Sequence, residues 1–213
     1  MIILENEKNF INNKIERKDL FKNKKINFLP KKILVMGLPG SGKTRLSKEL
    51  KKIIPIIHLN ADEIRKHFDD WDFSKEGRLR QADRMKRFSD YIFLEKISAI
   101  ADFVCPLDET RKILNPDIII WMDTEKKGRF ENTNKIFQKP KKFHFRIIRQ
   151  SKFIIQFNHP QGGGNGDNFK RFLGNTCSSG NDLKEILNEI SLTIAELIKL
   201  LFWDKPIYEK GSA

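Results

Sequence analysis

Residues 33–44 read Ile33-Leu34-Val35-Met36-Gly37-Leu38-Pro39-Gly40-Ser41-Gly42-Lys43-Thr44, an apolar run followed by a glycine-rich octapeptide. The octapeptide fits the pattern G-x-x-x-x-G-K-[ST], and it lies between an apolar strand pattern and a helical pattern, as this motif requires. In that setting successive backbone N–H groups converge on phosphate oxygens, and the dipole of the following helix adds positive potential. The stretch therefore predicts a loop that binds the phosphates of a nucleoside triphosphate.

Two side chains of the loop have specific predicted tasks. Lys43 is expected to reach the β and γ phosphates, and the hydroxyl of Thr44 is expected to bind Mg²⁺. We therefore predict ATP and Mg²⁺ as cofactors and Lys43 as a catalytic residue. The predicted nucleotide-binding residues are Gly37, Leu38, Pro39, Gly40, Ser41, Gly42, Lys43 and Thr44.

The positive charge of the chain is concentrated in two stretches. The 213 residues carry a formal net charge of +13, of which residues 1–32 contribute +5 and residues 138–152 contribute +6. Such stretches could bind nucleic acid or an anionic surface, or they could be solvated lysine-rich segments. We favour the solvated alternative, so nucleic acid is the less favoured partner and a small-molecule nucleotide substrate the favoured one.

Several observations bear on the compartment. No stretch approaches the roughly 18 apolar residues of a membrane-spanning helix, and the N-terminus lacks the apolar region of a signal peptide. Cys105 and Cys177 form no metal-binding or redox spacing. A cytoplasmic protein without a membrane partner is expected.

Strand and helix patterns alternate along the first two thirds of the chain. Apolar runs predict strands over residues 31–36, 56–59, 97–104 and 117–122, and apolar spacings of three and four predict a helix from Lys43 and another over residues 76–96. This alternation is typical of an α/β fold in which helices flank a parallel β-sheet. We expect the second strand to lie beside the first.

The rest of the chain is predicted in three parts. Residues 1–30 are a basic N-terminal arm, and residues 31–157 are the core, with strands over 143–148 and 153–157. Residues 158–213 contain the glycine-rich loop 162–166 and a C-terminal amphipathic helix. The apolar face of that helix either packs on the domain or forms a homodimer.

Asp62 follows the second predicted strand, at the sheet edge where open parallel sheets bind ligands. A carboxylate at this place could take the proton from an acceptor hydroxyl that faces the γ phosphate. The alternative is that Asp62 caps the short helix that follows, over residues 63–68. We favour the catalytic role.

An acceptor site is predicted from residues beyond Asp62. Arg78, Gln81 and Arg84 share one helical row, which suits a phosphate or sulfate group. Arg65 either pairs with an anionic acceptor or is a surface arginine. Phe73 either stacks on a base or belongs to the core.

Together these motifs resemble the adenylylsulfate kinases, the family that phosphorylates the 3′-hydroxyl of adenosine 5′-phosphosulfate with ATP and Mg²⁺. The family pattern D-G-D-N-x-R reads here as residues 60–65, D-L-G-F-S as residues 70–74 and D-R-x-E-N-x-x-R as residues 77–84. The family's F-I-S-P corresponds to residues 103–106, and its D-T turn to Asp123 and Thr124. The resemblance covers about residues 31–137 and implies the P-loop kinase fold and ATP-dependent phosphorylation of an alcohol group.

The resemblance also implies roles for individual residues and shows departures. It implies that Asp62 deprotonates or orients the acceptor hydroxyl, that Arg65, Arg78 and Arg84 bind the phosphosulfate, and that Phe73 stacks on adenine. Gln81 stands where the family has Asn and is also predicted to bind the substrate. Lys127 and Phe137 correspond to substrate contacts in a lid that is contracted here, around residues 124–142. The residue after Pro106 is Leu107, where the family has an aromatic residue.

These departures leave two other hypotheses. One is a P-loop kinase that acts on a different nucleotide conjugate or on a nucleic-acid end. The other is a nucleotide-binding regulatory module whose C-terminal helix docks a partner.

Overall fold

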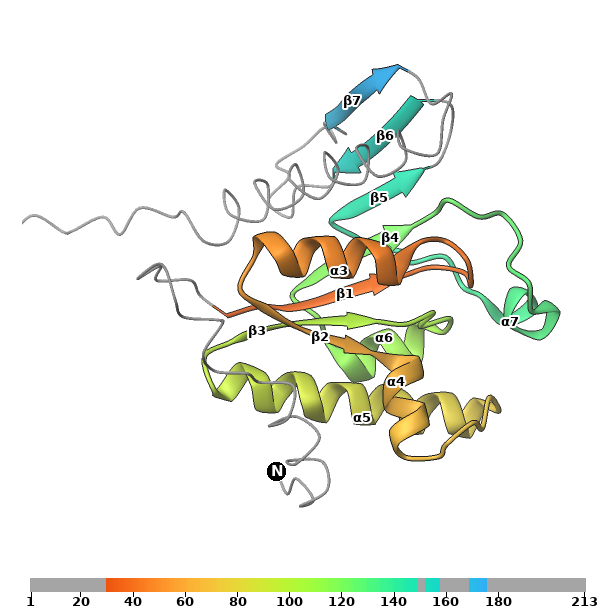
Figure 1. Cartoon of the computed structure of the whole chain (residues 1–213). Helices are drawn as coiled ribbons and strands as arrows, with labels where there is room; N and C mark the ends of the chain where they lie inside the picture. The colour runs from red at the N-terminus through yellow and green to blue at the C-terminus, as the bar shows by residue number, and fades with distance from the viewer. Residues whose placement is uncertain (1–29, 149–151, 158–168, 176–213) are drawn as a thin grey trace, which may run out of the picture.

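The computed structural model describes residues 30–148, 152–157 and 169–175, and its centre is one sheet with the strand order β2-β3-β1-β4-β5-β6-β7. The first five strands in this order pair in parallel, and β6 and β7 extend the sheet in antiparallel fashion (Figure 1). The strands are β1 (Lys32–Met36), β2 (Ile56–Asn60), β3 (Ser98–Asp102), β4 (Ile118–Met122), β5 (Phe145–Ile148), β6 (Lys152–Phe157) and β7 (Phe169–Asn175).

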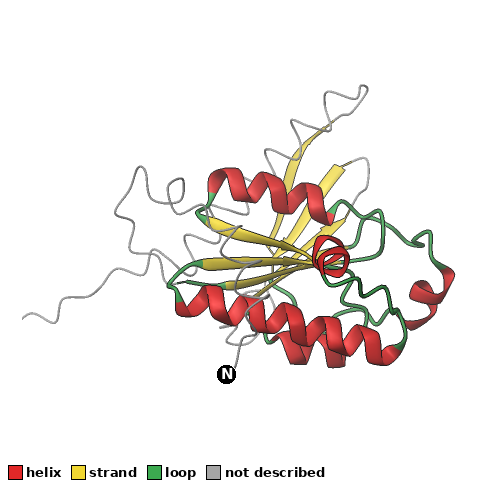
Figure 2. Cartoon of the chain, turned by 60° about the horizontal axis from the view of Figure 1, so that its bottom comes forward, coloured by secondary structure: helices red, strands yellow, loops and turns green. Residues whose placement is uncertain are grey.

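Helices cover both faces of the parallel part of the sheet. Helix α3 lies on one face, and α5 lies on the other with α6 beside it (Figures 1 and 2). The short helices α4 and α7 lie at the carboxyl end of the strands. The bounds are α3 (Lys43–Ile53), α4 (Ala61–His67), α5 (Lys75–Leu94), α6 (Asp108–Leu114) and α7 (Glu131–Ile136).

The core forms where α5 packs on the sheet. Met85, Phe88 and Ile92 recur at spacings of three and four on α5 and are fully buried against Leu34 and Leu59 of the strands. Ser74 begins this helix, because its side chain accepts a hydrogen bond from the N–H of Gly77. Apolar burial thus fixes α5 and, with it, the row of polar residues at its N-terminal end.

The predicted fold class is confirmed, with one correction to the strand order. The second strand was expected beside the first, but β3 lies between β1 and β2 and pairs with both. A crossover helix joins each pair of consecutive parallel strands, so consecutive strands need not be neighbours. The consequence is that Asp102, at the end of β3, becomes the neighbour of the phosphate-binding loop.

Some predictions lie outside the described residues. These are the N-terminal arm up to residue 29, the glycine-rich loop and the C-terminal amphipathic helix. Strand β7 was not predicted, and it adds to the same sheet beyond the end expected for the core. The domain boundaries remain predictions.

Candidate functional site

The loop over residues 37–44 has backbone conformations that require glycine at defined points. Gly42 precedes α3 with a φ of 91°, in the left-handed region that favours glycine. A Cβ on Gly37 would lie 2.4 Å from the carbonyl oxygen of Met122, so a side chain there would displace the end of β4. The start of the loop therefore packs tightly against the carboxyl end of β4.

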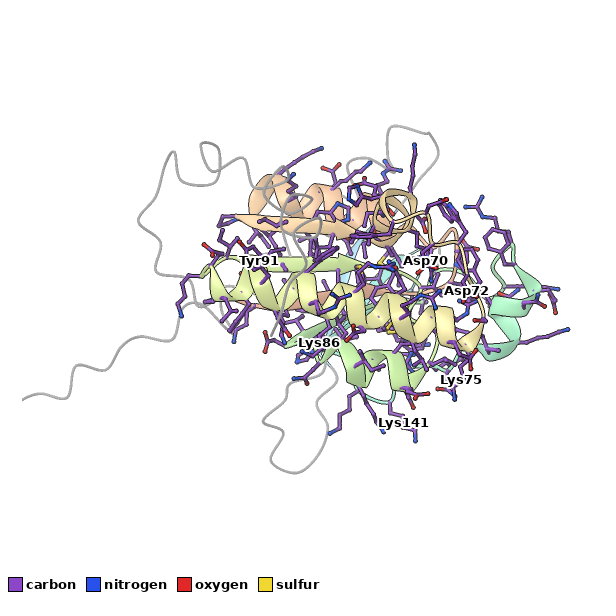
Figure 3. All side chains as sticks on the ribbon, turned by 90° about the horizontal axis from the view of Figure 1, so that it is seen from below. Asp70, Asp72, Lys75, Lys86, Tyr91 and Lys141 are labelled. Atoms are coloured by element: carbon purple, nitrogen blue, oxygen red, sulfur yellow. The ribbon has the colours of Figure 1, made fainter. Side chains whose placement is uncertain are left out.

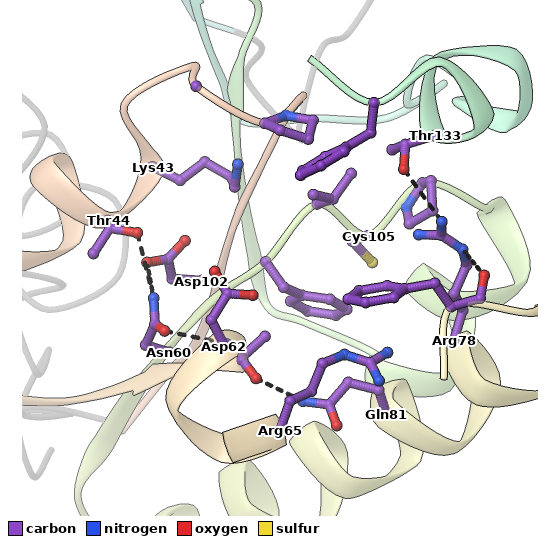
Figure 4. Close-up of a pocket in the computed structure, with 18 of the residues that line it drawn as sticks. Lys43, Thr44, Asn60, Asp62, Arg65, Arg78, Gln81, Asp102, Cys105 and Thr133 are labelled. Carbon is purple, nitrogen blue, oxygen red and sulfur yellow. Dashed lines mark hydrogen bonds between the residues drawn. The ribbon is translucent and has the colours of Figure 1, made fainter. Parts of the chain in front are cut away.

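This loop forms one wall of a cavity of about 880 Å³ at the carboxyl ends of the parallel strands. Figure 4 shows Lys43 and Thr44 on one side of the cavity and Arg78 with Gln81 on the other, with Asp62 between them. Eight of the predicted site residues other than glycines line this cavity: Pro39, Lys43, Thr44, Asp62, Arg65, Phe73, Arg78 and Gln81.

Lys43 lies folded over its own loop. Its Nζ donates a hydrogen bond to the carbonyl oxygen of Leu38 at 3.0 Å, and the residue is buried. Burial lowers the pKa of the ammonium group, and the carboxylates of Asp102 and Asp62 oppose that effect. Because phosphates would supply charge-assisted bonds stronger than one neutral carbonyl, this lysine can exchange its partner on nucleotide binding.

A buried polar network below the loop was missed by the sequence reasoning. Asn60 and Asp102 are register partners at the ends of β2 and β3, and Asn60 Nδ2 donates to Asp102 Oδ2 at 2.9 Å. The same Nδ2 lies 3.3 Å from Thr44 Oγ1, and His58 Nε2 lies 3.2 Å from Asp102 Oδ2. One feature of the sequence could have indicated this network. Asp102 stands at the end of an apolar strand, and burying an acidic side chain is unfavourable unless it is paired or functional.

The oxygen atoms at this end suit Mg²⁺. Thr44 lines the cavity and the carboxylate of Asp102, which is 2% exposed, belongs to the same wall. Within the described ranges no group of three or more His, Cys, Asp or Glu residues gathers to hold a metal. Mg²⁺ commonly takes one or two protein oxygens and receives the others from phosphates and water, so this sparse donor set fits that ion.

Asp62 is exposed toward the cavity and does not cap its helix. The cap of α4 is Asn60, whose Oδ1 accepts hydrogen bonds from the N–H groups of Asp62 at 3.1 Å and Glu63 at 3.0 Å. The capping alternative for Asp62 is therefore wrong, because the preceding residue already fills that position. The Asp62 carboxylate is left available for a substrate.

Three arginines converge on the carboxylate of Asp70. Arg80 and Arg84 each donate to it at 2.9 Å, and Arg65 lies 3.7 Å away. Figure 3 shows Asp70 and Asp72 beside the N-terminal half of α5. Hydrogen bonds from Arg80 hold the pKa of Asp70 well below its usual range, so this acid is charged at neutral pH and neutralises part of the cluster.

The guanidinium groups of Arg65 and Arg84 therefore form hydrogen bonds within the protein that stabilise the fold. Arg65 is 4% exposed and donates to the carbonyl oxygens of Asp70, Asp72 and Gly77, so the alternative of a surface arginine is wrong. Arg84 donates to Asp70 and to Gln81, and it does not line the cavity. Gln81, 2% exposed, also donates to the carbonyl oxygen of Ala61 and so ties α5 to α4.

Arg78 and Phe73 have a different environment. Phe73 is 53% exposed and lines the cavity, which excludes the core alternative for this residue. The guanidinium carbons of Arg65 and Arg78 lie 4.7 Å and 5.7 Å from its ring centroid. No carboxylate of the described residues forms an ion pair with Arg78, and burial lowers its pKa.

The lid segment contacts the phosphate-binding loop at two places. Thr124 Oγ1 donates to the carbonyl oxygen of Ser41 at 2.8 Å. A Cβ on Gly128 would lie 2.9 Å from Pro39, so the segment passes close over the loop. Arg129 lines the cavity near Lys43, where its charge contributes to lowering the lysine pKa.

Two predicted lid residues lie away from the cavity. Lys127 is exposed and pairs with Glu131 at 3.3 Å. Phe137 is partly buried and packs against the hydrophobic core. The aromatic lining comes from Phe73 together with residues not predicted, Trp71, Phe103 and Phe130.

The described helices include none that is both long and apolar enough to cross a bilayer. This finding concerns the described residues alone.

Comparisons with known proteins agree with the fold. The zeta toxin family model matches residues 16–102, which is less than half of the chain. No curated protein matches the chain. Among solved structures, the APS kinase CysC of Mycobacterium tuberculosis in complex with AMPPNP and APS is similar at 16% identity and a TM-score of 0.51, over 80% of this chain and 98% of that one.

Two further structures are similar at lower scores. A cysteine-to-alanine mutant of the same Mycobacterium tuberculosis enzyme has 19% identity and a TM-score of 0.47, over 80% of this chain and 97% of that one. A sugar kinase from Janibacter has 15% identity and a TM-score of 0.44, over 56% of this chain and 84% of that one. The first of these structures, the complex with AMPPNP and APS, and the family model agree with an α/β fold of the P-loop kinase type.

Proposed function

We propose that the protein is an ATP-dependent kinase that phosphorylates the 3′-hydroxyl of adenosine 5′-phosphosulfate. One observation carries the proposal: a single cavity has the phosphate-binding loop on one wall and, between that wall and Arg78, the carboxylate of Asp62, which pairs with none of the residues that the structure describes. A cavity that holds both a phosphate cradle and an uncommitted acid suits phosphoryl transfer from a nucleotide to an alcohol. The motifs shared with adenylylsulfate kinases support the choice of acceptor.

The donor is bound by the loop and by the side chains that support it. Backbone N–H groups of residues 37–44 and the start of α3 hold the β and γ phosphates, and Lys43 leaves the carbonyl oxygen of Leu38 to pair with them. Thr44 and Asp102 would hold Mg²⁺, and the bound ion would supply positive charge that neutralises the phosphates. The side-chain amide of Asn60 donates a hydrogen bond to the Thr44 hydroxyl and so orients it.

The acceptor reaches the donor across the cavity. Asp62 accepts a hydrogen bond from the 3′-hydroxyl, orients its oxygen toward the γ phosphorus and takes the proton as the new bond to phosphorus forms. The bond between the γ phosphorus and the bridging oxygen breaks, and ADP leaves with that oxygen. Phe73 stacks on the base and Arg78 binds the anionic end, so the reaction depends mainly on positioning and charge stabilisation.

The proposal is tested by measuring ADP formation with and without adenosine 5′-phosphosulfate. We expect acceptor-dependent ADP release, and we expect Asp62→Asn to retain ATP binding while turnover falls by about 10²-fold or more, as for loss of a general base. Asp69→Asn is the matched control, because Asp69 is an exposed acid just beyond the same helix. Absence of acceptor-dependent turnover by folded protein excludes this acceptor, and unchanged turnover in Asp62→Asn removes Asp62 from the mechanism.

A second candidate is a kinase of the same fold that acts on another nucleotide conjugate or on a nucleic-acid end. Two observations favour it. Arg65 and Arg84, two of the three arginines that the resemblance assigns to phosphosulfate, are held by Asp70 and by backbone and side-chain carbonyl groups, and Trp71 adds an aromatic surface to the cavity. A screen of acceptors with the same ADP assay separates the two candidates. Oligonucleotide binding that weakens steeply with salt would support the nucleic-acid version, and undetectable binding would exclude it.

A further inference from the structure

Arg78 lies on α5, and its guanidinium group does not pair with the carboxylate of Asp70. Arg65, Arg80 and Arg84 lie within 4 Å of the carboxylate of Asp70. Arg78 lies on α5 with Arg80 and Arg84, yet within the described residues its hydrogen bonds go to neutral oxygens alone. A buried cation with neutral partners gains more from a bound anion than one that is already paired.

One of those neutral oxygens belongs to the lid. Arg78 Nη2 donates to Thr133 Oγ1 at 3.2 Å, across 55 positions of the sequence, and both residues are buried (Figure 4). The other bond runs from Arg78 Nε to the carbonyl oxygen of Phe73 at 2.9 Å. The guanidinium therefore joins the loop before α5 to the lid helix α7.

The rest of α7 is connected locally. Asn134 exchanges hydrogen bonds with the backbone of Gly128, six residues earlier, and Lys127 pairs with Glu131. These bonds shape the lid but do not join it to the acceptor side. The Arg78–Thr133 bond makes that connection with a residue that faces the cavity.

We propose that Thr133 is a positioning residue: its hydroxyl aims the Arg78 guanidinium at the anionic group of the acceptor and thereby couples acceptor binding to the position of the lid. This inference rests on the proposed function for its acceptor, whereas the bond between α5 and α7 can be tested without any acceptor. An anion at Arg78 would share the guanidinium with Thr133 and hold α7 over the cavity. Thr133 would then set which acceptors reach Arg78 in the correct orientation.

The first measurement uses the ligand-free protein. Amide hydrogen exchange over residues 128–136 is compared for wild type, Thr133→Val, Thr133→Ser, Arg78→Gln and the Thr133→Val/Arg78→Gln double variant. We expect exchange about fivefold faster in Thr133→Val, the equivalent of one neutral hydrogen bond, with wild-type exchange in Thr133→Ser. The double variant should exchange no faster than the faster single variant, because both changes remove the same bond. Lys135→Gln, an exposed position on the same helix, is the control and should match wild type.

The second measurement is kinetic, with adenosine 5′-phosphosulfate as the probe. Thr133→Val should raise the KM for this acceptor about fivefold while the KM for ATP is unchanged, again the effect of one neutral hydrogen bond. Thr133→Ser should restore the wild-type value. Failure of the wild type to use this acceptor overturns the acceptor in the proposed function, and the hydrogen-exchange comparison then decides the inference. Unchanged exchange in Thr133→Val, or additive effects in the double variant, would overturn the coupling.

Discussion

The two walls of the cavity are built in different ways. The donor wall consists of residues 37–44 with Asn60 and Asp102, and its functional groups are fixed by backbone conformation and by the register of β2 and β3. The acceptor wall consists of Asp62, Arg65, Phe73, Arg78 and Gln81. The ion-pair cluster around Asp70 holds Arg65 directly and Gln81 through Arg84, whereas Arg78 bonds to neutral oxygens. A contiguous motif encodes the loop of the first wall, whereas the second wall depends on which arginine pairs with which carboxylate or carbonyl group.

The largest effect is expected from the donor wall. Lys43→Met should lower turnover by about 10³-fold, because a buried positive charge near the transferred phosphoryl group is lost. Steady-state ADP formation measures it, and circular dichroism verifies the fold. Lys48→Met is the control, since Lys48 is exposed on the same helix. Equal activities of the two variants would contradict the assignment of this wall to the donor.

The next effect concerns the cluster that supports the acceptor wall. Asp70→Asn should lower the free energy of unfolding by about 2 kcal/mol at neutral pH, because several arginines lose a shared charged partner. Urea unfolding at several pH values measures it. Since the folded-state pKa of Asp70 is lowered, its contribution is fully present above the ordinary value of 3.8 and is lost as the pH falls below it. The difference between variant and wild type should therefore shrink below that pH, and a constant difference would exclude the charge as its cause.

The smallest effects separate two arginines within the acceptor wall. Arg65→Lys should lower the free energy of unfolding by about 1 to 2 kcal/mol, because an ammonium group cannot reproduce the guanidinium's bonds to three carbonyl oxygens. Arg78→Lys should lower it by less, by about 0.5 to 1 kcal/mol, because two bonds are at stake instead of three, and it should raise the acceptor KM about tenfold. Paired urea unfolding and acceptor titrations measure both. The reverse pattern would show that Arg65 binds the anion and Arg78 supports the fold.

The difference between the walls also explains what the sequence could predict. The strand, glycine-rich turn and helix at residues 33–53 are local, so composition and spacing identify them together with the roles expected for Lys43 and Thr44. The helical row of Arg78, Gln81 and Arg84 was also visible, and all three are buried as a functional or structural row would be.

The partners of those residues could not be predicted. Arg84 donates a hydrogen bond to Asp70, which is 14 positions away in the sequence, and it does not line the cavity. No local sequence pattern distinguishes Asp70 from a solvated surface acid. Asp102 joins the donor wall because β3 lies between β1 and β2, a placement that depends on the crossovers and not on the strand residues. Phe137 was placed in the substrate site by resemblance, but the shorter lid packs it on the core.

The most direct test is a crystal structure with ADP, Mg²⁺ and adenosine 5′-phosphosulfate. We predict the ADP phosphates on the backbone amides of residues 37–44, the 3′-hydroxyl within hydrogen-bond distance of Asp62, and the anionic end of the acceptor on Arg78. A structure with ADP bound and the acceptor absent from the cavity, or bound away from both Asp62 and Arg78, would contradict the proposal.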